Sequence, residues 1–397
     1  MPRFCRPYGH DLLRQAKMSP EEGPVPGRKG SRSDDRQERK LQAHLYNLIK
    51  EEIKGQRAYA TGMSAAPIRL DANENPFSLP DELHKEFLAS LVSVPLNRYP
   101  AAGSPEVLAR FAKSYRVAEN MVMVGNGSDE LIQVLCTALS ATYVLAPVPT
   151  FAMYRICALN SGHKVLAAPL NDEFDLDLPV MLTLIDKYRP ALVFLSYPNN
   201  PTGNCFSREK METLLQQAPG LVVVDEAYGY FSGQSFLTLL GKYENLVVLK
   251  TLSKIGLAAL RIGFLIAAPP LVQELNKVRM PYNLNALSQA AAGFYLDHEA
   301  VFLAQAAEIV RERGRLWQAL QRLPGIRPYS SAANFIFFSC LFDTSQVYED
   351  LCNQGILIKS FSAIENLKNF MRVTVGTRRE NELFQGVLER VIAKLGA

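Results

Sequence analysis

Short apolar runs that alternate with amphipathic segments constrain the fold of this chain more than any other feature. From about residue 120 onward these runs are bounded by turn signals and are apolar on both faces. Such runs are typical of strands in a parallel sheet that is covered by helices on both sides. The runs are MVMV (121–124), YVLAPV (143–148), KVLAAPL (164–170), ALVFL (191–195), LVVVD (221–225), NLVVLK (245–250) and IGFLIAA (262–268).

The segments between these runs have a helical pattern. SPEVLARFAKSYR opens at Ser104 and SREKMETLLQQ opens at Ser207, and in both a serine can cap the first helical turn. Because strands and helices alternate, we predict an α/β fold with a large, doubly wound, mostly parallel seven-stranded sheet.

The chain changes character on both sides of this alternation. Beyond residue 283 a long helical stretch leads to NFIFF, GILIKS, RVTV and a terminal helix, which predicts a smaller α+β domain. A chain of 397 residues is long enough for two such domains. The predicted division is a disordered extension (1–40), an N-terminal arm or small-domain segment (41–75), a large cofactor-binding domain (76–282) and a small C-terminal domain (283–397).

Charge and cysteine usage narrow the class of protein. The formal net charge is +4, but residues 1–40 hold ten Lys/Arg and six Asp/Glu, and the rest of the chain holds 33 of each. A neutral body argues against a nucleic-acid partner, and no apolar stretch reaches the ~18 residues that span a bilayer. The six cysteines are scattered without a C-x-x-C pair, which indicates reduced thiols in a cytoplasmic protein. We predict no metal site.

Four strand ends carry the residues that suggest chemistry. GNGSDE (125–130), SYPNNPTG (196–203), EAY (226–228) and TLSK (251–254) each directly follow an apolar run. Ligands of an open α/β sheet bind beyond the carboxyl ends of its strands. We therefore expect Gly-rich turns, amides, a carboxylate, a phenol and a lysine to lie close together.

Lys254 and Arg261 stand in TLSKIGLAALRIGF (251–264), a segment that is otherwise apolar. If Lys254 is buried, desolvation and Arg261 both lower its pKa, and an amine nucleophile becomes available. Arginine binds phosphate in a bidentate manner. No Asp or Glu lies between Glu244 and Glu274, so the partner of Arg261 is either distant in sequence or a ligand.

Asp225 ends a strand that is expected to be buried, so its carboxylate needs a cationic or hydrogen-bonding partner. Taken alone, a helix cap explains it equally well. Together with an amine nucleophile and an anion site where GNGSDE begins a helix, it describes a pyridoxal 5′-phosphate site. In that site Lys254 forms a Schiff base with the cofactor's aldehyde, and Arg261 holds its phosphate.

From about residue 50 to its C-terminus the chain resembles the fold-type-I pyridoxal-phosphate aminotransferases of class I/II, and among them the histidinol-phosphate aminotransferases. The motifs that carry this resemblance are IKGQRAYATG (53–62), LDANENP (70–76), NRYP (97–100), GNGSDEL (125–131), PTFAMY (149–154), PNNPTG (198–203), VVVDEAY (222–228), TLSKIGLAALRIGF (251–264), SAANF (331–335) and RVTVGTRRE (372–380).

The resemblance implies three groups of site residues. The catalytic residues would be Lys254, Asp225 and Tyr228. The cofactor-binding residues would be Ser128, Asp129, Phe151, Asn200, Asp225, Tyr228, Ser253, Lys254, Arg261 and Tyr99. The substrate-binding residues would be Tyr59, Asn73, Asn200, Lys359 and Arg372.

The resemblance also implies individual roles. Asp225 would keep the pyridine nitrogen protonated, and Asn200 and Tyr228 would hydrogen-bond the cofactor's 3′-oxygen. Phe151 would stack on the ring. Tyr99 would reach into the site of a neighbouring subunit, which implies a homodimer.

Three positions depart from the usual pattern of the family. Phe151 stands where a tyrosine is common, and Arg261 follows Lys254 by seven residues, one fewer than in many relatives. Lys359 stands where many histidinol-phosphate enzymes have an arginine, and the two cations differ in how they bind phosphate.

The predicted activity is transfer of the amino group of histidinol phosphate to 2-oxoglutarate, which gives imidazole-acetol phosphate and glutamate in histidine biosynthesis. A threonine-phosphate decarboxylase and an aromatic amino-acid aminotransferase are alternatives with the same cofactor. A regulator with an aminotransferase-like domain would need an N-terminal DNA-binding domain, and residues 1–40 lack a periodic trio of helices.

Overall fold

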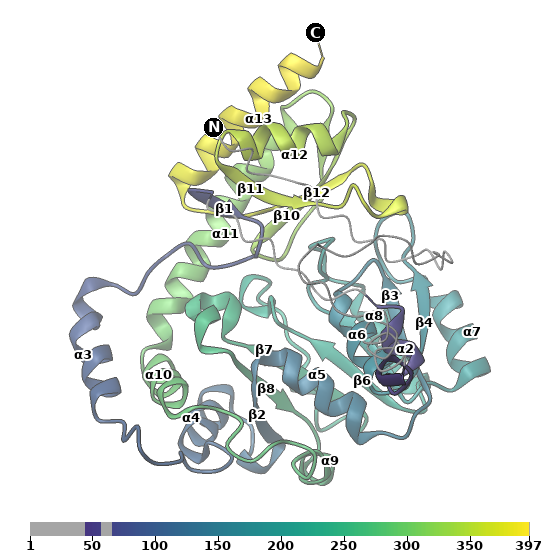
Figure 1. The fold of residues 1–397 in the computed structure, drawn as a ribbon, viewed down its shortest axis with the longest axis vertical. Coiled ribbons are helices and arrows are strands. Elements are labelled where there is room, and N and C mark those ends of the chain that lie inside the picture. The colour runs from purple at the N-terminus through teal and green to yellow at the C-terminus, as the bar shows by residue number, and fades with distance from the viewer. Residues whose placement is uncertain (1–43, 57–65, 397) are drawn as a thin grey trace, which may run out of the picture.

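The computed structural model describes residues 44–56 and 66–396. The predictions for residues 1–40 and for Tyr59 lie outside the described residues. Figure 1 shows a large sheet domain and a smaller domain, with a long helix running from one to the other.

The large domain is built on a sheet of seven strands in the order β2-β8-β7-β6-β5-β3-β4. All neighbouring strands are parallel except at β8, which is antiparallel to both β2 and β7. The prediction of a mostly parallel seven-stranded sheet is therefore confirmed. Its strands are β2 (Val122–Asn126), β3 (Tyr143–Val148), β4 (Lys164–Pro169), β5 (Leu192–Ser196), β6 (Leu221–Asp225), β7 (Leu246–Thr251) and β8 (Ile262–Ile266).

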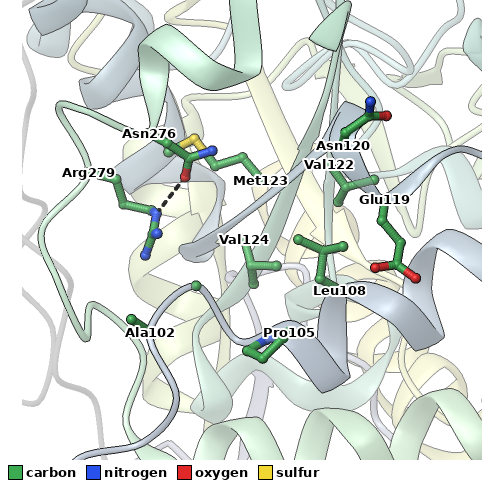
Figure 2. Close-up of a pocket in the computed structure, with 11 residues that line it drawn as sticks. Ala102, Pro105, Leu108, Glu119, Asn120, Val122, Met123, Val124, Asn276 and Arg279 are labelled. Atoms are coloured by element: carbon green, nitrogen blue, oxygen red, sulfur yellow. Dashed lines mark hydrogen bonds between the residues drawn. The ribbon is translucent and has the colours of Figure 1, made fainter.

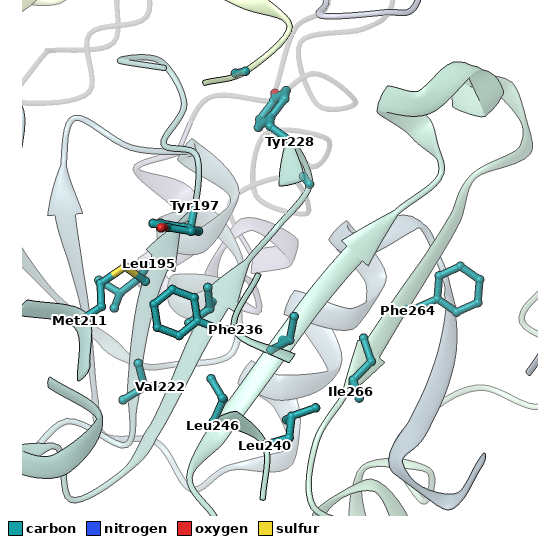
Figure 3. Close-up of a cluster of buried hydrophobic side chains, with 14 of the residues drawn as sticks. Leu195, Tyr197, Met211, Val222, Tyr228, Phe236, Leu240, Leu246, Phe264 and Ile266 are labelled. Carbon is teal, nitrogen blue, oxygen red and sulfur yellow. The ribbon is translucent and has the colours of Figure 1, made fainter. Parts of the chain in front are cut away.

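Helices cover both faces of this sheet because its strands are apolar on both sides. One buried cluster includes Val222, Leu246 and Ile266 together with Phe236 (Figure 3). Helices that contribute to this cluster are α4 (Pro105–Tyr115), α7 (Leu178–Tyr188), α8 (Arg208–Gln217) and α10 (Ala286–Asp297). Helices on the opposite face are α5 (Gly127–Ala138), α6 (Ala152–Asn160) and α9 (Pro269–Leu275).

Of the two predicted serine caps, one is correct and one is wrong. The Ser207 side chain accepts a hydrogen bond from the backbone N–H of Lys210 at the start of α8. Ser104 makes no such bond, because its backbone has a left-handed φ of +53° rather than the extended conformation that a capping residue adopts. Pro105 occupies the first position of α4 instead.

The smaller domain contains a five-stranded sheet in the order β1-β11-β12-β10-β9. Its strands are β1 (Ile68–Leu70), β9 (Ile326–Pro328), β10 (Phe335–Cys340), β11 (Ile356–Ser360) and β12 (Phe370–Thr374). The helices α12 (Thr344–Asn353) and α13 (Arg378–Leu395) pack on it. β1 runs parallel to β11, so a segment from near the N-terminus completes the C-terminal sheet.

Helix α11 (Glu299–Gln321) belongs to both domains. Its first half places Phe302 and Ile309 in the core of the large domain, and its second half places Leu316 and Leu320 in the core of the small one. Two further helices among the described residues are α2 (Glu51–Lys54) and α3 (Asp81–Val92). No helix in the described ranges combines the length and the hydrophobicity that a bilayer span requires.

Candidate active site

The first part of the site is an anion cradle where β2 passes into α5. Arg261 donates one hydrogen bond to the Ser253 hydroxyl (3.1 Å) and pairs with Asp129 through another nitrogen (3.0 Å). The partner of Arg261 within the chain is thus a carboxylate far away in sequence. Asp129 itself lies in the first turn of α5, where N–H groups have no partner inside the helix.

Close backbone approach at Gly127 allows Arg261 to reach the helix start. Gly127 has a φ of +79°, and a Cβ atom on it would lie 2.6 Å from a guanidinium nitrogen of Arg261. Only glycine adopts this conformation without strain and also leaves room for the guanidinium. Helix N–H groups, a serine hydroxyl and an arginine are the donors that a phosphate requires, so the cradle fits the phosphate of pyridoxal phosphate.

Asp225 lies at the end of β6 and is almost completely buried. One carboxylate oxygen accepts a hydrogen bond from the Tyr154 hydroxyl (2.7 Å) and the other accepts one from the Ala227 N–H (3.0 Å). Burial raises the pKa of Asp225 to about 6, although both hydrogen bonds act in the opposite direction. A buried carboxylate of this kind gains from a cationic partner, and a protonated ring nitrogen fits that requirement.

Lys254 lies in a π-helical turn (Ser253–Leu257) that follows β7 directly. Its Nζ donates a hydrogen bond to the Ala72 carbonyl (3.1 Å) and lies 5.9 Å from the centre of the Tyr228 ring. Burial, and after it the charge of the nearby cation Arg372, lower the pKa of Lys254 to about 8. The lysine is therefore closer to a neutral amine at neutral pH than an exposed lysine would be.

Hydrogen bonds connect Tyr228 to both domains. Its hydroxyl accepts from the side-chain amides of Asn73 (2.9 Å) and Asn200 (3.2 Å). Asn200 in turn accepts from Arg372 (2.6 Å) of the small domain. Asn73 is buried, has a φ of +55° and bonds Thr374 of the small domain as well. The two domains therefore meet at the predicted site.

Two predicted substrate-binding cations stand side by side in the small domain. Lys359 on β11 and Arg372 on β12 are paired directly across the antiparallel strands, so their side chains point to the same face. Burial lowers the pKa of Lys359, and the charge of Arg372 lowers it further. The nearby carboxylate of Asp71 acts in the opposite direction but also lies 4.0 Å from Arg69, so three cations share it.

Two other predicted residues have different surroundings. Phe151 precedes α6, and its ring meets that of Tyr154 edge-on. Tyr99 is 81% exposed and stacks on Tyr282 (4.6 Å between ring centres). Its side chain therefore lies on the surface of the subunit.

Tyr154 was not among the predicted site residues. The residue stands in the PTFAMY motif, where only Phe151 was assigned a role, and its hydroxyl contacts Asp225. A tyrosine three residues after Phe151, on the same helix face, was a signal that could have indicated it.

A separate pocket of about 430 Å³ lies beside β2, the edge strand of the large sheet (Figure 2). Leu108, Val122, Val124, Asn276 and Arg279 are among its lining residues. None of the predicted site residues that the structure describes lines it, so it is distinct from the candidate active site.

Comparison with known proteins gives a consistent result. Residues 65–388 match the family model for aminotransferase class I and II. The chain is 43% identical over 346 residues to histidinol-phosphate aminotransferase 2 of Nitrosococcus oceani, an alignment that covers 86% of this chain and 96% of the relative. It is 40% identical over 353 residues to the histidinol-phosphate aminotransferase of Aquifex aeolicus, which covers 88% and 99%.

Solved structures share the fold. The histidinol-phosphate aminotransferase of Sinorhizobium meliloti, in complex with pyridoxal-5′-phosphate, superposes with a TM-score of 0.79. The two sequences are 21% identical, and the superposition covers 87% of this chain and 98% of that one. At this identity the likeness concerns the fold.

Proposed function

The chain belongs to the class I and II aminotransferases, and from this premise we propose that its amino donor is histidinol phosphate. The protein is a pyridoxal-phosphate-dependent aminotransferase. In the proposed reaction the amino group passes to 2-oxoglutarate, and the products are imidazole-acetol phosphate and glutamate. The observation that carries the choice of donor is the pairing of Lys359 with Arg372 next to the candidate site.

The residues of the site divide the work of this reaction. The chemistry supplied by pyridoxal 5′-phosphate, when bound, is an aldehyde that takes up the amino group and a ring that accepts electrons. Ser253, Arg261 and the first turn of α5 would hold its phosphate, and Asn200 with Tyr228 would hydrogen-bond its 3′-oxygen. Phe151 would stack on its ring.

Lys254 and Asp225 carry the proton chemistry in this proposal. Because the pKa of Lys254 falls to about 8, its amine can remove the proton from the substrate's Cα near neutral pH. Asp225 would hold the proton on the ring nitrogen and so maintain the electron-accepting state of the ring. Its buried position excludes water, which would otherwise weaken that ion pair.

The paired cations suit a doubly charged anion better than a carboxylate. Lys359 and Arg372 repel each other in a partly buried environment, and the charge of Arg372 adds to burial in lowering the pKa of Lys359. A phosphate carries up to two negative charges and three acceptor oxygens, so it relieves this repulsion and accepts from both side chains. This argument supports a phosphorylated amine as the donor.

The donor can be tested with purified holoenzyme and 2-oxoglutarate. Histidinol phosphate, phenylalanine and threonine phosphate are supplied separately, and both glutamate formation and CO₂ release are measured. We expect the highest kcat/KM with histidinol phosphate, with glutamate and no CO₂ as the outcome. If phenylalanine is the best donor, or if threonine phosphate releases CO₂, the proposed substrate is wrong.

We also propose that the enzyme works as a homodimer. Tyr99 is exposed, and so are two apolar side chains close to the pair in sequence: Leu96, three residues before Tyr99, and Met280, two residues before Tyr282. A stacked tyrosine pair (Tyr99 and Tyr282) on an apolar surface is typical of a protein interface. A cytoplasmic location remains a prediction.

A further inference from the structure

We propose that Tyr154 is a positioning residue that orients the Asp225 carboxylate and keeps it ionised for the ring nitrogen of the cofactor. This inference rests on the proposed cofactor site. It assigns a role to a residue for which the sequence analysis gave none, and it explains why Asp225 can hold a charge in a buried position.

The geometry around Tyr154 fixes its hydroxyl in one place. The side chain is 1% exposed, and its ring stacks on Phe194 of β5 with 4.6 Å between ring centres and an angle of 3° between the planes. The ring of Phe151, which directly precedes α6, meets it edge-on. A ring packed in this way has little rotational freedom, so the hydroxyl is held at 2.7 Å from the Asp225 Oδ2 atom.

The hydroxyl of Tyr154 can act only as a neutral donor to Asp225. Burial and the neighbouring carboxylate of Asp225 raise the pKa of Tyr154 well above its ordinary value. A tyrosine that keeps its proton offers it to the carboxylate, and a hydrogen bond of this kind stabilises the ionised form of the acid.

Asp225 has few other sources of stabilisation. Burial disfavours its ionised form, and the negative charges of Asp129 on α5 and Glu226 beside it act in the same direction. The phenol of Tyr228 also faces it, and ionisation of that phenol is itself disfavoured by Asp225. The donors that oppose these effects are the Tyr154 hydroxyl and the Ala227 N–H.

Removing the hydroxyl tests this role with a readout other than turnover. The dissociation constant of pyridoxal phosphate for cofactor-free protein is measured from pH 5 to 8 in the wild type and in Tyr154→Phe. Binding to the ring nitrogen needs ionised Asp225, so affinity falls as the pH drops through the pKa of that carboxyl. We expect the midpoint of this fall to move up by about one pH unit in Tyr154→Phe. The cofactor's own phosphate titrates in the same way with both proteins, so it does not contribute to the difference between their midpoints.

Tyr197→Phe is the matched control. Tyr197 is equally buried, but its hydroxyl bonds Gln234 and its ring packs edge-on against Phe236 on the opposite face of the sheet (Figure 3). We expect this variant to keep the wild-type midpoint. The melting temperature of each cofactor-free variant shows how much of any effect comes from the fold.

A second substitution at Tyr154 should keep the fold and shift the pH midpoint of cofactor affinity in the opposite direction. Replacement of Tyr154 by 3-fluorotyrosine preserves the shape and the donor but makes the hydroxyl more acidic, so it should stabilise ionised Asp225 and move the midpoint to lower pH. An unchanged midpoint in both Tyr154 variants would overturn the positioning role, even if affinity were lower. Failure of the cofactor site is distinguishable, because then Asp225→Asn would leave affinity unchanged at every pH.

Discussion

At the scale of single residues, Lys254 differs from an ordinary surface lysine in its surroundings. Burial brings its pKa to about 8, so roughly a tenth of the amine is unprotonated at pH 7. We predict that borohydride reduction of the holoenzyme fixes the cofactor covalently to this residue. Peptide mapping locates the label, and a label on Lys250, which is buried on β7 and paired with Glu226, would contradict the assignment.

Asp225 provides the second residue-scale prediction. Asp225→Asn should still bind the cofactor but should lower kcat by at least about 10²-fold, because an amide cannot hold the ring nitrogen protonated. Steady-state assays at saturating cofactor measure this effect. A variant with a near-normal rate would show that Asp225 has only a structural role.

The same substitution has a separate effect on the stability of the cofactor-free protein. The folded pKa of Asp225 is about 6, above its ordinary value near 4, so the native state binds more protons than the unfolded state between these pH values. Stability from this group is therefore lost as the pH rises from about 4 to 6. Asp225→Asn should remove that loss, which melting curves at pH 4 and pH 7 would show.

Candidate site residues could be predicted from the sequence where a charged residue stands in an apolar context. Lys254, Asp225 and Arg261 were predicted in this way, and the structure places each of them at or next to the end of a strand. The pairing of Arg261 with Asp129 and the contact of Tyr154 with Asp225 could not be found, because each joins residues far apart in the chain.

At the scale of elements, the seven strands of the large sheet were predicted to within two residues at each end. Continuous apolar runs between turn residues give a strong signal for strands that are buried on both faces. Neither strand β1 nor its pairing with β11 was predicted, because a strand of three residues has almost no periodicity of its own. Ser104 shows that a suitable residue type does not guarantee a helix cap.

The start of α5 supplies a prediction at this scale. Gly127→Ala should weaken cofactor binding by at least about tenfold, because a methyl group would displace Arg261 and strain a backbone with positive φ. Gly314→Ala is the control, since this glycine lies within α11 with open space around it. The control should keep cofactor affinity and gain up to about 1 kcal/mol of stability. Equal cofactor affinity in both variants would exclude a tight cradle at Gly127.

At the scale of the whole molecule, the proposed homodimer would make each active site depend on two subunits. Lys254→Ala and Tyr99→Ala homodimers should each have low activity. Mixed dimers made by co-expression should regain part of it, because one of their two sites combines an intact Lys254 with an intact Tyr99 from the other subunit. If the activity of the mixed dimers equals the mean activity of the two variant homodimers, the active site is not shared between subunits.

The substrate phosphate is the feature on which the proposed function depends most. The direct measurement is the ratio of kcat/KM for histidinol phosphate to that for histidinol, in the wild type, Arg372→Ala, Lys359→Ala and Lys359→Arg. Loss of the hydrogen bonds from Arg372 to Asn200 and Asp71 changes kcat/KM for histidinol phosphate and for histidinol alike. A change in the ratio therefore reports the contact with the substrate's phosphate. Cofactor affinity is measured in parallel as a control for the fold of the site.

We predict that Arg372→Ala lowers this ratio by an amount equivalent to about 2–4 kcal/mol of transition-state stabilisation. Lys359→Ala should lower it less, mainly through KM, and Lys359→Arg should preserve or raise it, because arginine binds phosphate in a bidentate manner. If Arg372→Ala instead reduces kcat/KM equally for histidinol phosphate and histidinol, the pair of cations does not recognise phosphate. The histidinol-phosphate proposal would then be wrong.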